Sequence, residues 1–198
     1  MSHEPTDRRN RDASYYQDLH ESNPAFQHNN WLIEELPVLA ALGGRSLLEV
    51  GCGNGRFLRE AARSWSEVVG LDWARSPLIA EVLRDCPNVR FIQADVRAFR
   101  WPQRFDVLAS ADVLEHLPPS ALAETLPNLH RMARLNFHKI ACYDDGHSHL
   151  SIHPPEWWLA RFQDLAPDAG YRLHRVTARK GDPTKQVITL TNGSHAAP

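Results

Sequence analysis

The feature that most constrains the fold is a glycine-rich turn between an apolar run and a helix-like pattern. The apolar run ends at residues 47–50, and three glycines then occupy alternate positions: Gly51, Gly53 and Gly55. An apolar pattern with helical spacing begins at Phe57. This order predicts a strand, a tight turn and a helix N-terminus, because glycine accepts turn geometry and leaves no Cβ between the backbone and a ligand. The G-x-G-x-G spacing differs from the G-x-G-x-x-G of dinucleotide-binding turns.

Two more apolar runs end beside an acidic residue, as the first does at Glu49. Residues 68–71 lead to Asp72, about 20 residues beyond the glycines, where a Rossmann-like unit places its ribose-binding acid. The two oxygens of a carboxylate can accept hydrogen bonds from two vicinal ribose hydroxyls. Residues 89–93 lead to Asp95. The position of Asp72 therefore predicts a ribose-containing ligand at the ends of the strands.

A fourth apolar run at residues 105–110 leads into the segment at 111–117, ADVLEHL. In order and spacing, the four runs closely resemble the motifs of the class I S-adenosylmethionine (SAM) dependent methyltransferases. The resemblance implies an α/β fold with a Rossmann-like seven-stranded sheet, parallel with an antiparallel last strand, and helices on both faces. The strand-like runs at 171–177 and 186–191 agree with that ending, which a dehydrogenase Rossmann domain lacks.

The resemblance implies SAM as the cofactor, bound where the strands end. It implies a ribose contact for Asp72 and an adenine contact for Asp95. The cofactor-binding residues are expected to be Glu49, Gly51, Cys52, Gly53, Asp72, Trp73, Asp95, Val96 and Ala111. A small side chain fits at Cys52, between two glycines, and no chemistry is expected of its thiol. Asp106 opens a strand instead of closing it, so a structural role is expected.

The chain is expected to form one domain with additions at both ends. Residues 1–13 are charged and poor in apolar side chains, which predicts disorder. Residues 14–43 contain an apolar stripe at near-helical spacing, which predicts helix. The resemblance implies that this segment forms a cap over the cofactor and acceptor. The methyltransferase core is expected at residues 44–193, followed by a tail at 194–198. Within the core, Pro127 lies inside a helical pattern and predicts a kink or a break.

The amino-acid composition limits which binding partners and which cellular compartment are expected. The 22 Lys and Arg residues are balanced by 24 Asp and Glu residues, so the chain has no overall basic field to attract nucleic acid. Three widely separated cysteines without a C-x-x-C pair suit a reducing cytosol. No apolar run approaches the ~20 residues of a membrane span. We therefore expect a cytoplasmic protein with no membrane or nucleic-acid partner, and the sequence leaves its oligomeric state open.

Histidines gather where the methyl acceptor is expected. A hydroxyl acceptor must lose a proton, which favours a base beside it. His116 directly follows the fourth strand, and family members with a similar Glu-His-Leu segment often place that histidine near the acceptor. His149 lies in a histidine-rich loop after the fifth strand, which is expected at residues 139–143. His116 and His149 are therefore the candidate catalytic bases, although His116 could instead order its loop through backbone hydrogen bonds.

Side chains from two segments are expected to line the acceptor site: the segment before the first strand and the loop after the fifth. Aromatic walls suit the ring of a phenol or the apolar face of a sugar. We therefore expect methyl transfer to a small-molecule or glycan hydroxyl. The expected acceptor contacts are Tyr16, Trp31, His147, His153 and Trp157.

Two other functions remain open. The chain could be a SAM-binding subunit without catalytic activity, although the histidines favour an active enzyme. It could also be a metal-dependent methyltransferase of the 3′-terminal ribose of RNA, because the pattern of Asp112, Glu115, His116 and His153 resembles the metal ligands of that family. That pattern normally opens with Glu where this chain has Asp112, and no basic RNA-binding face is evident. We therefore expect no metal ion.

Overall fold

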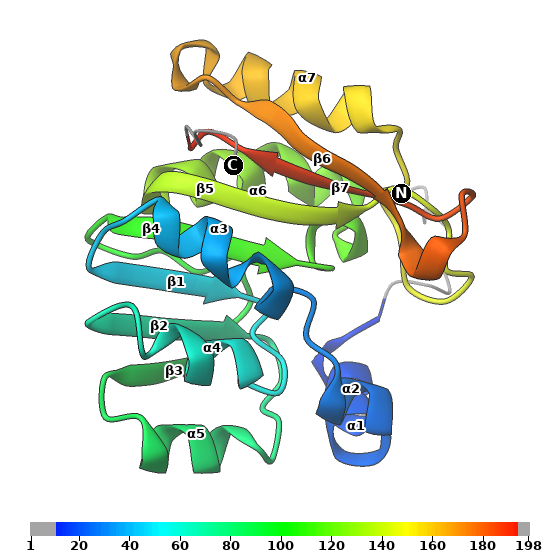
Figure 1. The fold of residues 1–198 in the computed structure, drawn as a ribbon. Helices are drawn as coiled ribbons and strands as arrows, with labels where there is room; N and C mark the ends of the chain where they lie inside the picture. Colours follow the sequence, from blue (N-terminus) through cyan, green and yellow to red (C-terminus); the bar gives the residue numbers. More distant parts are fainter. Residues whose placement is uncertain (1–10, 194–198) are drawn as a thin grey trace, which may run out of the picture.

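The computed structural model describes residues 11–193, which form a seven-stranded sheet flanked by helices (Figure 1). The strand order is β3-β2-β1-β4-β5-β7-β6. Strands β1 to β5 are parallel, and β7 runs antiparallel to both of its neighbours. This arrangement confirms the fold expected from the sequence. The strands are β1 (Ser46–Val50), β2 (Glu67–Asp72), β3 (Val89–Gln93), β4 (Phe105–Ala111), β5 (Ala133–Ala141), β6 (Arg172–Ala178) and β7 (Gln186–Thr191).

Helices cover both faces of the sheet, as Figure 1 shows. Each face has its own buried cluster because alternate residues of a strand point to opposite faces: Leu47 joins one cluster and Leu48 the other. None of the described helices is long and apolar enough to cross a membrane. The first face carries α3 (Leu36–Ala41), α4 (Arg56–Ala61) and α5 (Ile79–Asp85), and the second carries α6 (Pro119–Met132) and α7 (Pro155–Leu165).

The N-terminal helices lie beside the carboxyl edge of the parallel strands (Figure 1). The Asp12 side chain caps the first of them by accepting a hydrogen bond from the Tyr15 N–H at 3.1 Å. The buried amide of Asn54, after β1, donates to the carbonyls of Phe26 at 2.9 Å and Asn29 at 2.7 Å. These bonds join the N-terminal segment to the glycine turn. Its elements are α1 (Ala13–Ser22), α2 (Pro24–His28) and the short 3-10 helix η1 (Ile33–Glu35).

Both ends of the chain fall outside the described part. The expected disordered segment at 1–13 lies there except for its last three residues, which lead into α1. The expected tail at 194–198 lies there entirely.

Two sequence features of the core have structural consequences. The Asp106 carboxylate at the start of β4 accepts hydrogen bonds from the backbone N–H groups of Arg45 at 2.7 Å and Ser46 at 3.1 Å. It therefore joins the beginnings of β4 and β1.

Pro127 lies inside one continuous helix, α6, so the expected break is absent. The helix continues because residues on both sides of Pro127, such as Leu122 and Leu129, are buried in the same cluster.

Candidate active site

A cavity of about 510 Å³ lies at the carboxyl edge of the parallel strands. The strand order reverses there between β1 and β4, which is where open α/β sheets bind their ligands. Its lining also includes side chains of α1 and of the loop after β5. A cavity of this size suits a small organic ligand.

The glycine turn forms part of the cavity wall, and its shape depends on the absence of side chains. Gly51 has φ of 72°, and a Cβ there would lie 2.3 Å from Cγ2 of Val113. Any larger residue would therefore push the turn away from the segment after β4. The side chain of Cys52 is fully buried, with its Sγ packed close to Gly70 of β2. Cys52 can thus contact a ligand only through its backbone.

Two acids lie beside the turn. Asp72 accepts hydrogen bonds from the N–H of Gly53 at 2.8 Å and of Ala74 at 3.0 Å, so its carboxylate is held in one orientation. The Oε1 atom of Glu49 lies 3.5 Å from the amide of Asn30, and its buried Oε2 has no hydrogen-bond partner in the described residues. Burial raises the pKa of Asp72 and raises that of Glu49 well above its usual value. The Oε2 atom of Glu49 therefore lacks a polar partner that a ligand could supply.

The third acid, Asp95, is not free. Its carboxylate forms a bidentate ion pair with Arg97, whose NH2 lies 2.6 Å from Oδ2. Burial alone would raise the pKa of Asp95, but the Arg97 side chain holds it below the usual value. The Arg97 guanidinium in turn lies over the ring of Trp73, 4.7 Å from its centroid. Val96 and Ala111, two of the predicted cofactor contacts, also line the cavity.

His20 of α1 is a cavity residue that the sequence interpretation missed. It is buried, and a Cβ on Gly53 would lie 3.6 Å from its Cε1, so the imidazole covers the glycine turn. Burial lowers its pKa, and its Nδ1 has no hydrogen-bond partner among the described residues. His20 follows Tyr16 by one helical turn, and this i,i+4 spacing is the signal that could have identified it.

His116 and His149 both line the cavity, with their ring centroids 4.8 Å apart. His116 follows β4 in the 3-10 helix η2 (Leu114–His116). The Tyr16 hydroxyl lies 3.4 Å from its Nδ1, although the two residues are far apart in the sequence. Burial is the largest cause that lowers the pKa of His116, to about 4. The imidazole is therefore neutral at physiological pH.

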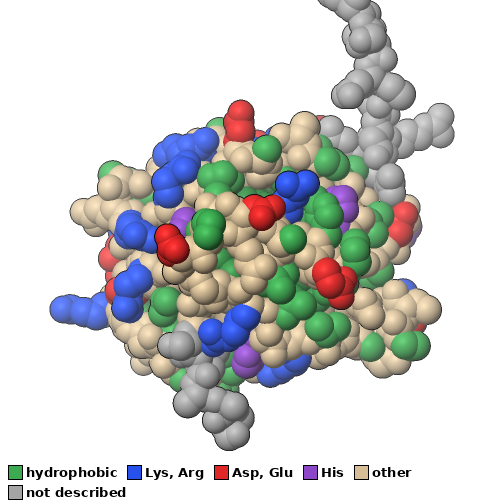
Figure 2. Space-filling model, turned by 90° about the horizontal axis from the view of Figure 1, so that it is seen from above, with side chains coloured by type: hydrophobic (Ala, Val, Ile, Leu, Met, Phe, Trp, Pro, Cys, Tyr) green, Lys and Arg blue, Asp and Glu red, His purple; other side chains and the backbone are tan. Residues whose placement is uncertain are grey.

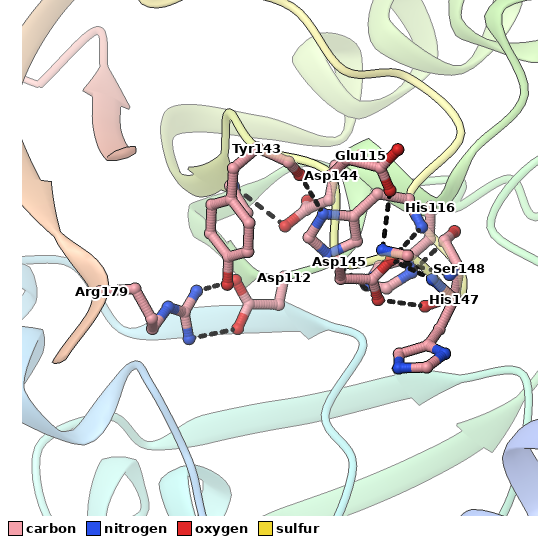
Figure 3. Close-up of polar contacts among 12 residues, drawn as sticks. Asp112, Glu115, His116, Tyr143, Asp144, Asp145, His147, Ser148 and Arg179 are labelled. Atoms are coloured by element: carbon pink, nitrogen blue, oxygen red, sulfur yellow. Dashed lines mark hydrogen bonds and ion pairs between the residues drawn. The ribbon is translucent and has the colours of Figure 1, made fainter. Parts of the chain in front are cut away.

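Asp145 orders the loop that carries the histidines after β5 (Figure 3). Its carboxylate accepts the backbone N–H groups of His147 at 2.9 Å, Ser148 at 2.8 Å and His149 at 3.0 Å. Burial opposes ionisation, but these hydrogen bonds hold the pKa of Asp145 below its usual range. The sequence interpretation assigned no role to Asp145, although acidic residues commonly form such local turns.

The structure does not bring His153 and Trp157 to the cavity, which corrects the expected acceptor contacts. Their rings stack on each other, 3.6 Å apart and tilted by 14°. The reason is that α7 begins at Pro155, and Trp158 anchors it in the core. His153 is also not grouped with Glu115 and His116 as a possible metal ligand, so the RNA-family pattern is not assembled. The remaining expected contacts line the cavity: Tyr16, Trp31 and His147.

Asp112, which lines the cavity, forms an ion pair with Arg179 (Figure 3). Asp112 has φ of 52°, which is unusual for a residue with a side chain. Its carboxylate binds both terminal nitrogens of Arg179, at 2.9 and 2.5 Å. The guanidinium lies 4.2 Å from the centroid of Trp31. Arg179 belongs to η4 (Arg179–Gly181), between β6 and β7, so the pair ties that turn to the end of β4.

Comparisons with known proteins agree with this architecture. Residues 47–136 match the model of a methyltransferase domain. The match to this domain and the seven-stranded sheet agree with the fold of the class I SAM-dependent methyltransferases. The chain is 34% identical over 115 residues to the ubiquinone biosynthesis O-methyltransferase of Pseudomonas putida strain GB-1, a match that covers 55% of this chain and 47% of that protein. The chain thus spans about half the length of the curated relatives it matches.

Solved methyltransferase structures share the fold at low sequence identity. The 1,6-didemethyltoxoflavin-N1-methyltransferase of Burkholderia thailandensis, solved with S-adenosylhomocysteine, has a TM-score of 0.68 at 18% identity, covering 90% of this chain and 84% of that one. The N-methyltransferase NodS of Bradyrhizobium japonicum WM9 has a TM-score of 0.66 at 14% identity, covering 93% and 100%. On the face drawn in Figure 2, Lys and Arg side chains are mixed among acidic and apolar ones.

Proposed function

We propose that this chain transfers the methyl group of SAM to a hydroxyl of a small molecule. The observation that carries the proposal is one cavity that joins the glycine turn and Asp72 to the pair of His116 and His149. SAM supplies an electrophilic methyl group on its sulfonium, and the protein has to hold an acceptor oxygen in line with it. The P. putida relative is named an O-methyltransferase, which supports a hydroxyl as the acceptor.

We assign the cofactor end of the cavity to the glycine turn and its acids. Asp72 offers its carboxylate to the ribose hydroxyls, while Gly51 and Gly53 let the cofactor approach the backbone. The unpartnered Oε2 of Glu49 can accept a hydrogen bond from the ammonium of the methionine part. Asp95 would contact adenine. Because its carboxylate is paired with Arg97, the two side chains would together form a polar wall beside the adenine.

We assign the acceptor end to the other side of the same cavity. Tyr16, Trp31 and His147 form its walls, and their rings suit a phenol or a sugar. The imidazoles of His116 and His149 would lie against the acceptor hydroxyl, and the neutral form of His116 would favour loss of its proton. Orientation of the acceptor toward the methyl group can contribute several kcal/mol to the rate.

A screen of acceptors tests the proposal directly. Purified protein would be incubated with SAM and a panel of phenols and sugars, and formation of S-adenosylhomocysteine would be measured. Turnover with members of the panel supports the proposal. Calorimetric SAM binding without turnover on any acceptor, short RNAs included, would instead identify a catalytically silent SAM-binding subunit.

Replacement of an acceptor-side histidine tests the assignment of the two ends. His116→Ala should reduce kcat by roughly 10²–10⁴-fold, because a group that assists proton transfer contributes a factor of that size. Its SAM affinity should stay close to that of the unchanged protein, since the cofactor lies toward β1 and β2. His28→Ala is the matched control, because His28 is exposed and does not line the cavity. Loss of SAM binding in His116→Ala would contradict the assignment.

A further inference from the structure

We propose that Glu115, His116 and His149 bind a divalent transition-metal ion at the acceptor end of the cavity. The catalytic part of this inference rests on the proposed function, but the binding site itself does not. Among the described residues, one possible ligand atom from each of the three lies within 4.8 Å of the others. Ligands around one ion at about 2.0–2.2 Å are at most about 4.4 Å apart, so small side-chain movements would close the site.

One of the two carboxylate oxygens of Glu115 has no hydrogen-bond partner among the described residues. The Oε1 atom accepts a hydrogen bond from the Ala141 N–H at 2.9 Å. The Oε2 atom is the one without a partner, and it is buried. The side chain itself is fully buried. A buried polar atom without a partner is costly, and a bound cation would remove that cost.

Both histidines have their Nδ1 atoms next to backbone carbonyls. The Nδ1 of His149 lies 2.6 Å from the carbonyl oxygen of Tyr143, and that of His116 lies 3.3 Å from the carbonyl oxygen of Ser148. A carbonyl can only accept, so these contacts favour a proton on each Nδ1 and a lone pair on each Nε2. Metal-binding histidines are commonly oriented by such a hydrogen bond from their other ring nitrogen.

The backbone holds the three ligands in place before any ion binds. The carbonyl of Glu115 accepts the N–H groups of Leu150 at 2.7 Å and Ser151 at 2.9 Å, which ties η2 to the loop after β5. Asp145 holds the N–H of His149 in the same loop. The segment after β4 and the loop after β5 therefore form one connected unit, and a preorganised site binds an ion with less loss of conformational freedom.

The donor set and the surrounding charge indicate the class of ion. One carboxylate and two imidazoles suit Mn²⁺, Fe²⁺, Co²⁺, Ni²⁺ or Zn²⁺ better than Mg²⁺, which prefers oxygen ligands. Asp112 and Asp145 add negative charge nearby, but Asp112 is occupied by Arg179. Three protein ligands leave coordination positions open, and His116 and His149 line the cavity, so an open position can face an acceptor.

An ion in this place would act on the acceptor oxygen. Its charge would favour ionisation of the hydroxyl, with the proton released to solvent. The oxygen electron pair would then form the new bond to the methyl carbon of SAM. The bond from that carbon to sulfur breaks at the same time, and its electron pair stays on sulfur.

Metal binding can be measured directly, without an assay of enzyme activity. The full chain would be treated with a chelator, dialysed and titrated with Co²⁺ by calorimetry and visible absorption. We expect one Co²⁺ per chain, bound at least tenfold more tightly than Mg²⁺. Glu115→Gln, which keeps an acceptor for the Ala141 N–H, and His149→Ala should each weaken Co²⁺ binding by about 10–100-fold.

His153→Ala is the matched control, because its ring stacks on Trp157 away from the cavity, and it should bind Co²⁺ like the unchanged chain. Absence of Co²⁺ binding up to millimolar concentration, or equal binding by both site variants, would overturn the proposed site. Turnover that continues in the presence of a chelator would contradict a catalytic role for the metal ion and leave the proposed function intact. Specific Co²⁺ binding without turnover on any acceptor would support the site and contradict the proposed function.

Discussion

Asp72 shows how a single side chain can serve both the fold and the ligand. Its carboxylate already accepts hydrogen bonds from Gly53 and Ala74, so it fixes the glycine turn before any ligand arrives. Each carboxylate oxygen can accept more than one hydrogen bond, which leaves capacity for two ribose hydroxyls. His20 covers the same turn from α1. Contacts of residues distant in sequence thus converge on one carboxylate.

Asp72→Ala should weaken SAM binding by about 1.5–3 kcal/mol, the range for hydrogen bonds to a charged group. This corresponds to roughly a 10–150-fold rise in the dissociation constant measured by calorimetry. Thermal unfolding of the variant checks that the glycine turn survives. Asp18→Asn serves as the control, because Asp18 is an exposed residue of α1 outside the cavity lining. Equal SAM affinity in Asp72→Ala and the unchanged protein would remove Asp72 from the cofactor site.

At the scale of elements, the connection between β1 and β4 determines where the cavity opens. The Asp106 carboxylate accepts two backbone N–H groups at the start of β1 and joins the two strands at the edge opposite the site. Gly44 is needed beside it, because a Cβ there would lie 2.4 Å from the Asp106 Cβ. The carboxyl ends of the same strands then lie side by side and present the glycine turn next to η2.

Asp106→Asn should lower the free energy of unfolding by about 1 kcal/mol at pH 7, a small value because the carboxylate is partly exposed. The hydrogen bonds from Arg45 and Ser46 lower the pKa of Asp106, so the folded state favours the charged form. That stabilisation is present above the unfolded pKa of about 3.9 and is lost as the pH falls through the folded value. Urea unfolding at several pH values should show the difference disappear in acid. A difference independent of pH would disprove the electrostatic explanation.

At the scale of the whole molecule, the two buried clusters meet through the sheet, and polar groups lie inside them. His138 of β5 is fully buried, lies against Phe162 of α7 and shares a 2.9 Å hydrogen bond with the Ser110 hydroxyl. Lys139, the next residue, points to the opposite side and forms ion pairs with Glu34 and Glu35. Strand β5 therefore holds both the core and the N-terminal segment that covers the site.

His138 should make the whole fold sensitive to acid. Burial lowers the pKa of His138 to about 3, while an unfolded histidine has a pKa near 6.5. Between these values the unfolded chain binds the extra proton, so stability falls as the pH falls, by up to about 1.4 kcal/mol per pH unit. Urea unfolding of His138→Gln between pH 4 and 6 should therefore show a shallower slope than that of the unchanged chain. Parallel slopes would indicate that His138 is protonated within the fold.

The sequence by itself determined most of the apolar runs that form strands, the glycine turn and the positions of the acids at the strand ends, and the arrangement of the sheet followed from the family resemblance. The runs and the turn follow from local chemistry, because apolar runs form buried strands and glycine alone permits the turn at Gly51. The runs at 47–50 and 186–191 could be placed for the same reason, and they lie in β1 and β7. Such patterns need only a few neighbouring residues to be recognised.

Only the tertiary structure decided which side chains meet after β4 and β5. His149 lies beside Glu115 and His116, whereas the nearby His153 stacks on Trp157. Arg179 reaches Asp112 from a turn far along the chain. These contacts depend on how the loops after β4 and β5 pack against each other. That packing is set by the register of whole strands and by buried backbone hydrogen bonds, which no short sequence pattern encodes.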